Sequence, residues 1–367
     1  MRRTRARRAG SGLLVLAVAL AGCASAASSG GSVSASAAEA PVFEVDPFWP
    51  RPLPNNWLMG QAAGVAVDRR DHVWVVQRPK SLTEDERGAT LKPPRSLCCV
   101  PAPSVMEFDK TGTLVQAWGA VAGHPWPDNE HGIYVDDKDN VWLAGNGAKD
   151  GMILKFTRDG KLLMKIGEPG VIGNDADTRH LNRPANLVVD PATRELFVAD
   201  GYGNHRVIVF DAETGSYKRH WGASGRPPGD TSVKGFGNPV HCIRLSRDGL
   251  VYVCDRANNR IQVFRKDGTF VREFVVAPQT RGNGSTWDVD LSQDATQMHL
   301  YSADGENNQV WMLLRESGRV LGSFGRSGRS AGQFHWIHNM AVDSAGNIYT
   351  TEVDSGKRAQ KFTLRSR

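Results

Sequence analysis

One segment pattern recurs six times along the chain, and it constrains the fold more than any other feature. Each copy begins with a small or polar residue, continues with a short stretch rich in apolar residues, and reaches Asp or Ser before a turn and a second strand. Short strands with Gly and Asp turns, repeated at intervals of this kind, predict an all-β repeat fold. The copies begin at Ala63, His131, Ala185, His241, Trp287 and His338.

Each copy continues into further strand signals. The second strand is rich in aromatic and β-branched residues, as in Val73-Trp74, and a third strand follows it. Four strands per unit, repeated around a ring, predict a β-propeller, and six units predict six blades. A fourth strand ends in an apolar residue and Gly in four copies, at Trp118-Gly119, Ile166-Gly167, Trp221-Gly222 and Phe324-Gly325.

The last copy stops after its third strand, at residues 361–363. Residues 41–45, near the N-terminus, have the composition of a strand, and we expect them to supply the missing outer strand. This pairing would close the ring and remove a free sheet edge.

The first 23 residues predict an export signal. Five arginines fall within the first eight residues, and the apolar run that follows is too short to cross about 30 Å of hydrocarbon. Residues 20–23, Leu-Ala-Gly-Cys, resemble the bacterial lipobox, in which the cysteine receives lipid. A plain secretory signal cleaved after Ala26 is the alternative. We expect a signal peptide at 1–23 with lipidation at Cys23, a flexible tether at 24–40 and a propeller at 41–367.

Charge excludes one class of partner. The chain carries 45 Lys and Arg against 39 Asp and Glu, a net charge of +6. Five of those arginines lie in the signal segment, so the remaining 40 basic residues almost balance the 39 acidic ones. A nucleic-acid binder would carry its basic surface on the folded body. We therefore expect a monomer outside the cytoplasm that binds no nucleic acid and meets the membrane only through a lipid anchor.

Histidine occupies the first repeat position in alternate copies. The innermost strand of each blade lines the central channel, so the six first positions form a ring. His131, His241 and His338 fall in the second, fourth and sixth units, which are related by a threefold axis. Three neutral imidazoles with an open fourth position are typical of catalytic zinc. We predict a zinc site at these residues; the alternative is three unrelated polar residues at strand entries.

Two arginines share another register. Arg78 follows Trp74 by four positions, and Arg256 follows Tyr252 by four, in opposite blades of the ring. Guanidinium is always charged and binds carboxylates in a fork. Their position beside a metal predicts an anionic substrate, whereas a surface salt bridge is the alternative for each.

Several motifs resemble NHL-type propeller repeats and, more narrowly, the peptidyl-α-hydroxyglycine α-amidating lyases (peptidylamidoglycolate lyases). The resemblance covers most of the stretch from about residue 60 to residue 364, and it also implies a six-bladed propeller. The segments that carry it are residues 60–66, 131–133, 182–184, 200–207, 254–262 and 334–338, together with His241.

The resemblance implies an activity and a set of roles. The family splits the C–N bond of a peptidyl-α-hydroxyglycine and releases a peptide amide and glyoxylate. Its zinc histidines fall on the same three residues that the ring argument selects. Its catalytic tyrosine falls on Tyr202, and its two arginines fall on Arg78 and Arg256.

The resemblance also implies a structural calcium site. In the family, backbone carbonyls at the positions of Val65 and Ile133 and a carboxylate at the position of Asn339 hold the ion. This chain has an amide at the third position, which weakens the expectation of calcium. Trp336 stands where the family has a methionine near the site, which indicates a different pocket.

The cysteines do not fall on the family's disulfide positions. Cys242 and Cys254 flank a hairpin with the turn 247–249, which would place them opposite each other. They either form a disulfide or remain as free buried cysteines. Cys98 and Cys99 lie in a Pro-rich insertion, residues 81–103, which we expect at the rim of the first blade.

The sequence leaves three functional hypotheses. The first is a zinc-dependent lyase that acts on a peptidyl-α-hydroxyglycine or a related carbinolamide, with a small anionic or peptide substrate. The second is a non-catalytic, envelope-tethered NHL propeller that binds a peptide or glycan partner. The third is another propeller hydrolase, such as a lactonase. A binding module has no need for three metal-ready imidazoles, so the histidine ring favours the lyase.

Overall fold

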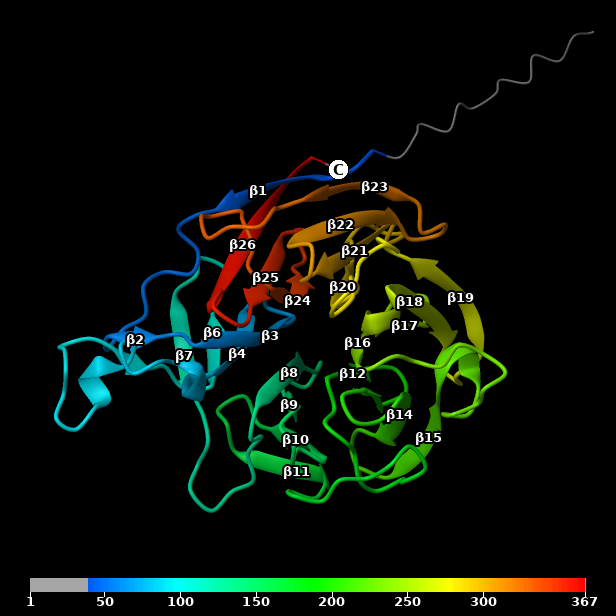
Figure 1. The fold of residues 1–367 in the computed structure, drawn as a ribbon, viewed down its shortest axis with the longest axis horizontal. Coiled ribbons are helices and arrows are strands. Elements are labelled where there is room, and N and C mark those ends of the chain that lie inside the picture. Colours follow the sequence, from blue (N-terminus) through cyan, green and yellow to red (C-terminus); the bar gives the residue numbers. More distant parts are fainter. Residues whose placement is uncertain (1–38, 367) are drawn as a thin grey trace, which may run out of the picture. The chain divides into compact units, whose positions relative to one another are not determined.

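The computed structural model describes residues 39–366, which form a six-bladed β-propeller (Figure 1). The expected signal peptide, Cys23 and all but the end of the tether lie outside the described residues. Each blade is a four-stranded antiparallel sheet; in the first five blades the strands run in chain order from the channel outward, and in the sixth blade the N-terminal strand takes the outer position. The prediction of an all-β fold with six blades is confirmed. No helix in the described part of the chain is both long and apolar enough to cross a membrane.

The strands of the first three blades follow the six-unit pattern. They are β3 (Gln61–Val67), β4 (Val73–Arg78), β6 (Val105–Phe108) and β7 (Leu114–Trp118); β8 (Glu130–Val135), β9 (Val141–Gly145), β10 (Met152–Phe156) and β11 (Leu162–Gly167); and β12 (Asn186–Asp190), β13 (Glu195–Asp200), β14 (Arg206–Asp211) and β15 (Tyr217–Trp221).

The remaining blades repeat the arrangement. They contain β16 (Val240–Leu245), β17 (Leu250–Asp255), β18 (Arg260–Arg265) and β19 (Phe270–Val275); β20 (Asp288–Leu291), β21 (His299–Asp304), β22 (Gln309–Leu314) and β23 (Val320–Phe324); and β24 (Ile337–Val342), β25 (Ile348–Glu352), β26 (Arg358–Ser366) and β1 (Val42–Asp46). Short 3₁₀ helices are η1 (Pro79–Ser81), η2 (Gly88–Thr90), η3 (Ala223–Gly225) and η4 (Arg256–Asn258).

The ring is closed by its N-terminal strand. β1 pairs antiparallel with β26, and Val45 lies opposite Phe362. Figure 1 shows the first and last strands side by side at the outer edge of the sixth blade. The expected closure is confirmed: the N-terminal strand covers the edge of β26 and becomes the outer strand of the sixth blade.

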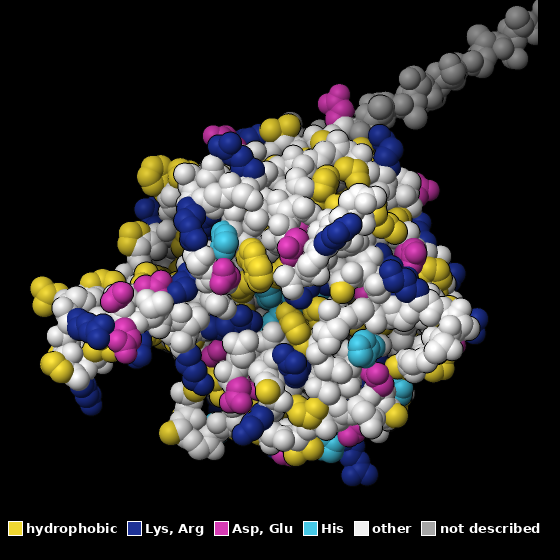
Figure 2. Space-filling model, in the orientation of Figure 1, with side chains coloured by type: hydrophobic (Ala, Val, Ile, Leu, Met, Phe, Trp, Pro, Cys, Tyr) yellow, Lys and Arg dark blue, Asp and Glu magenta, His cyan; other side chains and the backbone are white. Residues whose placement is uncertain are grey.

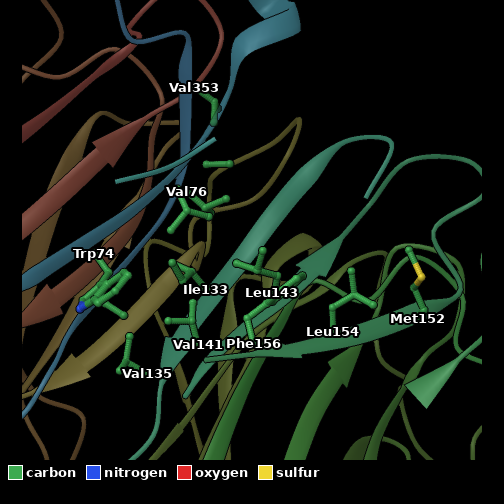
Figure 3. Close-up of a cluster of buried hydrophobic side chains, with 13 residues drawn as sticks. Trp74, Val76, Ile133, Val135, Val141, Leu143, Met152, Leu154, Phe156 and Val353 are labelled. Carbon is green, nitrogen blue, oxygen red and sulfur yellow. The ribbon is translucent and has the colours of Figure 1, made fainter. Parts of the chain in front are cut away.

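Burial follows the position of each strand in its blade. Inner strands are covered on both faces and read as continuous apolar runs, as in β17, whereas the outer strand β19 alternates between covered and exposed residues. The blades pack face to face through apolar side chains. Between the first two blades this core includes Trp74, Leu143 and Phe156 (Figure 3).

Glycine is required where a turn of one blade meets an aromatic ring of the preceding blade. Gly160 and Gly268 have φ of +87° and +93°, and a Cβ on either would approach the rings of Trp118 or Trp221 to within 3 Å. Only glycine fits both the left-handed backbone and this close approach. The Trp-Gly signals of the sequence therefore mark blade-to-blade contacts.

The insertion of the first blade forms a lobe that projects from the ring (Figure 1). A short parallel pair of strands, β2 (Trp57–Leu58) and β5 (Val100–Pro101), fixes its base. Cys98 and Cys99 form a disulfide within it.

Candidate metal centre and active-site pocket

The three histidines of the ring meet at the channel axis. His131, His241 and His338 lie at the starts of β8, β16 and β24 and are almost fully buried. Their ring centroids are 4.6 to 4.9 Å apart, and one nitrogen of each lies within 4.8 Å of the others. The structure therefore brings together the three residues that the repeat register selects.

Backbone carbonyls of the intervening blades fix the orientation of each imidazole. The Nδ1 atoms of His131, His241 and His338 lie 2.7, 2.5 and 2.5 Å from carbonyl oxygens of the next blade. Because a carbonyl only accepts, each Nδ1 carries the hydrogen and each Nε2 presents a lone pair to the axis. The carbonyls belong to Ala185, Trp287 and Ala63, the other three members of the first-position ring.

The surroundings keep these imidazoles neutral. Burial, followed by the charge of Arg78, lowers the pKa of His338 to about 3. Burial and the neighbouring histidines hold the pKa of His131 well below its ordinary value, and burial with the charge of Arg256 does the same for His241. A neutral imidazole is the form that binds a metal ion, so the trio is ready for a cation at physiological pH.

The donor set fits zinc. Three neutral nitrogens with Nδ1 hydrogen-bonded to carbonyls are the usual ligands and outer partners of a catalytic zinc site. The fourth position faces Tyr202, whose hydroxyl lies 2.9 Å from Nε2 of His131 and 3.1 Å from Nε2 of His241. His338 Nε2 has no protein hydrogen-bond partner among those recorded for residues 39–366.

Tyr202 follows β13 in the third blade and reaches over the histidines. Arg256 Nη1 donates to its hydroxyl at 3.3 Å, and the guanidinium of Arg183 lies 5.7 Å from its ring. The Tyr202 hydroxyl therefore lies between two of the histidines and the Arg256 guanidinium.

The two predicted arginines lie on the same face of the ring. Arg256 starts η4 and stacks on Trp287, 4.3 Å from the ring centroid. Arg78 ends β4, donating through Nε to the Glu130 carbonyl at 2.7 Å and through Nη1 to Gln61 at 2.8 Å. Burial lowers the pKa of Arg78, against the opposing influence of Tyr202. Neither arginine forms a salt bridge with any carboxylate of the described chain, so both remain able to bind an anionic ligand.

These residues surround a pocket of about 220 Å³. Arg78, Tyr202 and Arg256 line it together with His338, and Trp287 and Trp336 form an aromatic wall with ring centroids 5.5 Å apart. Figure 2 shows the hollow at the middle of the ring, with histidine at its bottom and hydrophobic and basic side chains around it.

Deeper in the channel, the surroundings of Asn339 do not suit the calcium ion that the family resemblance implies. Val65, Ile133 and Asn339 are buried in the inner strands, and Asn339 donates to Asp288, the carboxylate that also pairs with the buried guanidinium of Arg244. Arg244 donates to Asp288 at 3.1 Å and to the carbonyl of Met340 at 2.8 Å. The Arg244 guanidinium already pairs with the Asp288 carboxylate and the Met340 carbonyl. A divalent ion would therefore find too few free oxygen ligands at this place.

The sequence reasoning missed Arg244 and Asp288. Both stand in inner strands whose other residues are apolar apart from His241 and Asp290, and charged residues at such buried strand positions were the available signal. A further group with metal-ligand side chains, Asp68, His72 and Glu107, is filled by Arg158, which pairs with both carboxylates. That group is an ion-pair network rather than a vacant site.

Of the two alternatives for Cys242 and Cys254, the structure shows the disulfide. Cys242 and Cys254 lie opposite each other in β16 and β17 and form a buried disulfide. This bond joins the strand that carries His241 to the strand that leads to Arg256.

Comparisons with known proteins agree with this architecture. A family model described as NHL repeat matches residues 181–210 and 240–264, which include Tyr202, His241 and Arg256. NHL repeat-containing protein 3 of Mus musculus is 28% identical over 239 residues, 62% of this chain and 58% of that protein.

Two relatives carry names of amidating enzymes. Peptidyl-alpha-hydroxyglycine alpha-amidating lyase 1 of Drosophila melanogaster is 25% identical over 347 residues, 87% of this chain and 59% of that protein. Peptidyl-glycine alpha-amidating monooxygenase B of Xenopus laevis is 26% identical over 336 residues, 85% of this chain and 34% of that protein. The chain thus spans between about a third and three fifths of the length of these three relatives.

Solved structures agree with the fold. A streptogramin B lyase aligns with a TM-score of 0.54 at 12% identity and covers 88% of this chain and 98% of its own. This likeness shows the fold alone. The chain is therefore a six-bladed β-propeller that contains segments matching the NHL repeat and has distant similarity to the peptidyl-α-hydroxyglycine α-amidating lyases.

Proposed function

We propose that the protein is a zinc-dependent lyase that cleaves the C–N bond of a peptidyl-α-hydroxyglycine or a related carbinolamide. The observation that supports this most directly is the convergence of three neutral histidines, a tyrosine hydroxyl and two arginines without carboxylate partners in one pocket. The distant lyase relatives point to the same class of reaction. His131, His241 and His338 would hold the metal.

The reaction needs one proton removed and one bond broken. Zinc, when bound, supplies Lewis acidity that makes the substrate α-hydroxyl more acidic. Tyr202 accepts the hydroxyl proton, the oxygen becomes the carbonyl of glyoxylate, and the electron pair of the C–N bond leaves with nitrogen. The nitrogen takes up a proton and departs as the amide. No oxidant or reductant is required.

The arginines orient the substrate. Arg78 and Arg256 flank the pocket from opposite blades and would bind the carboxylate of the glycine-derived part. Arg256 also donates to the Tyr202 hydroxyl at 3.3 Å, so it couples carboxylate binding to the base. The stacking of Arg256 on Trp287 keeps its guanidinium in place for both contacts.

The test combines metal analysis with a product assay. We expect about one zinc per chain in the purified protein and zinc-dependent release of glyoxylate from α-hydroxyhippurate. His241→Ala should lose both zinc and activity, whereas His124→Ala, at an exposed histidine, should lose neither. A metal-loaded, folded wild type that releases no glyoxylate from this or a peptidyl substrate would refute the lyase and leave the non-catalytic binding module.

We also propose that the domain works outside the cytoplasm, as a monomer attached through lipid on Cys23. The buried Cys242–Cys254 disulfide supports an oxidising location. Labelling of the expressed full chain with a radioactive fatty acid tests the anchor: Cys23→Ser should abolish incorporation, and unchanged labelling would contradict it.

A further inference from the structure

A layer of charged and polar side chains lies in the channel below the histidines. Asp288, on the inner strand of the fifth blade, is its centre. One of its oxygens accepts from Nδ2 of Asn339 at 2.7 Å, from the backbone nitrogen of Met340 at 2.9 Å and from Arg244 at 3.1 Å. Three blades therefore meet on one carboxylate.

Arg244 crosses the channel to reach this layer. It starts on β16 in the fourth blade, yet its Nη2 atom donates to the Met340 carbonyl of the sixth blade at 2.8 Å as well as to Asp288. The side chain is almost fully buried, and Asp290 and Tyr134 lie near enough to act on its charge. Burial opposes its charge, but Asp288 and Asp290 together raise the pKa of Arg244.

The layer separates the channel into two cavities. The active-site pocket lies above it, and a cavity of about 470 Å³ opens below, where Arg244 and Asp290 line the wall. No residue of the described chain is shared between the linings of the two cavities. Of the three histidines, His338 lines the upper pocket, and none of them lines the lower cavity.

The strand held by this layer is the one that presents His338. Asn339 and Met340 follow that histidine directly in β24, and both are tied to Asp288. The carbonyl of Met340 is the far partner of Arg244. Removal of the guanidinium would leave the Met340 carbonyl, two residues from a proposed metal ligand, without this donor. It would also leave the Asp288 carboxylate, which holds Asn339 and Met340, without its cation.

The layer also contains oxygen acceptors of the kind that bind divalent cations. The Oδ1 atom of Asn339 is buried and has no hydrogen-bond partner among the described residues. The Asp288 carboxylate, which Asn339 contacts through Nδ2, and the Met340 carbonyl accept from the guanidinium, and Asp290 lies near enough to act on its charge. Oxygen ligands of this type suit Ca²⁺ once a cation is missing.

We infer that Arg244 is an internal cation that occupies the lower channel in place of a divalent ion and acts as a positioning residue for His338. The wild-type protein then binds no calcium in the channel, and its metal centre depends on the guanidinium. The inference concerns metal binding and does not require the proposed lyase reaction.

The test compares Arg244→Ala and Arg244→Lys with Arg247→Ala, a matched control at an exposed arginine three residues further along. Co²⁺ binding to the metal-free proteins, followed by its visible absorption, measures the histidine centre without any activity assay. We expect Arg244→Ala to bind Co²⁺ up to about 10-fold more weakly, the lower end of the range for groups that contact a ligand directly, and with an altered spectrum. Arg244→Lys should recover part of the loss, and Arg247→Ala should match the wild type.

Calcium provides the second measurement. With the histidine centre loaded, wild-type protein should show no rise in melting temperature up to millimolar Ca²⁺ and no calcium retained in equilibrium dialysis. Arg244→Ala should gain a calcium-dependent rise. One tightly retained calcium per wild-type chain would overturn the inference, as would an Arg244→Ala protein with unchanged Co²⁺ affinity. If Arg244→Ala does not fold, the dialysis of wild type still decides whether the guanidinium excludes the ion.

Discussion

Acid should destabilise the metal-free protein in proportion to its buried histidines. An unfolded histidine titrates near pH 6.5, whereas His338 in the folded protein titrates near pH 3. Between these values the unfolded chain binds a proton that the folded chain does not, so stability falls as the pH falls from about 6.5 towards 3. His131 and His241 are shifted in the same direction.

The size of the effect follows from this window. Between pH 7.5 and pH 5.5 each such histidine should remove between 1 and 2 kcal/mol from the free energy of unfolding, and the three together about 4 kcal/mol. His338→Gln should therefore show a smaller loss than the wild type over this range, by about one third of the histidine contribution. His124→Gln, at an exposed position, should follow the wild type.

Urea unfolding in a chelator at several pH values measures these free energies. The difference between wild type and His338→Gln isolates the histidine from carboxylates that titrate in the same range. If the free energy of unfolding varied with pH in the same way for the two proteins, His338 would not be held neutral by burial. That result would contradict the conclusion that the three histidines are ready to bind a metal ion.

Three further outcomes follow from the structure. Tyr202→Phe should retain zinc but lose about 10²- to 10⁴-fold in kcat for glyoxylate release, as expected for a general base; retention of full activity would exclude that role. Burial raises the pKa of Asp290 to about 6, against the charge of Arg244, so the folded protein loses stability as the pH rises from about 4 to about 6; Asp290→Asn should raise the free energy of unfolding by about 1–3 kcal/mol at pH 8 and by about half as much at pH 5 in urea titrations, and a loss at pH 8 would contradict this. Replacement of both Cys242 and Cys254 by Ala should lower the stability by about 3 kcal/mol in the same assay, because the disulfide closes a loop with a sequence separation of 12, and equal unfolding midpoints would show that the bond contributes nothing.

Most of the fold could be predicted because it is repeated. Six copies of one pattern fix the number of blades, and the absence of a fourth strand in the last copy points to β1 as its closure. His131, His241 and His338 could be placed together because a shared register in a closed ring converts spacing along the chain into proximity.

The lower channel could not be predicted in the same way. Arg244, Asp288 and Met340 occupy different registers in three blades, so no repeat position relates them. Their contact depends on the reach and direction of one long side chain across the channel. The tautomers of the histidines were equally hidden, because the carbonyls that set them belong to Ala185, Trp287 and Ala63, whose side chains carry no such signal.

The pairing of β1 with β26 also sets the order of events during synthesis. The strand made first must wait, unpaired, until residues 358–366 have left the ribosome, because its only partner in the ring is the strand made last. The three imidazoles come from the second, fourth and sixth blades, so they can meet only after the inner strand of the sixth blade has been made. The proposed metal site would therefore be among the last parts of the domain to assemble.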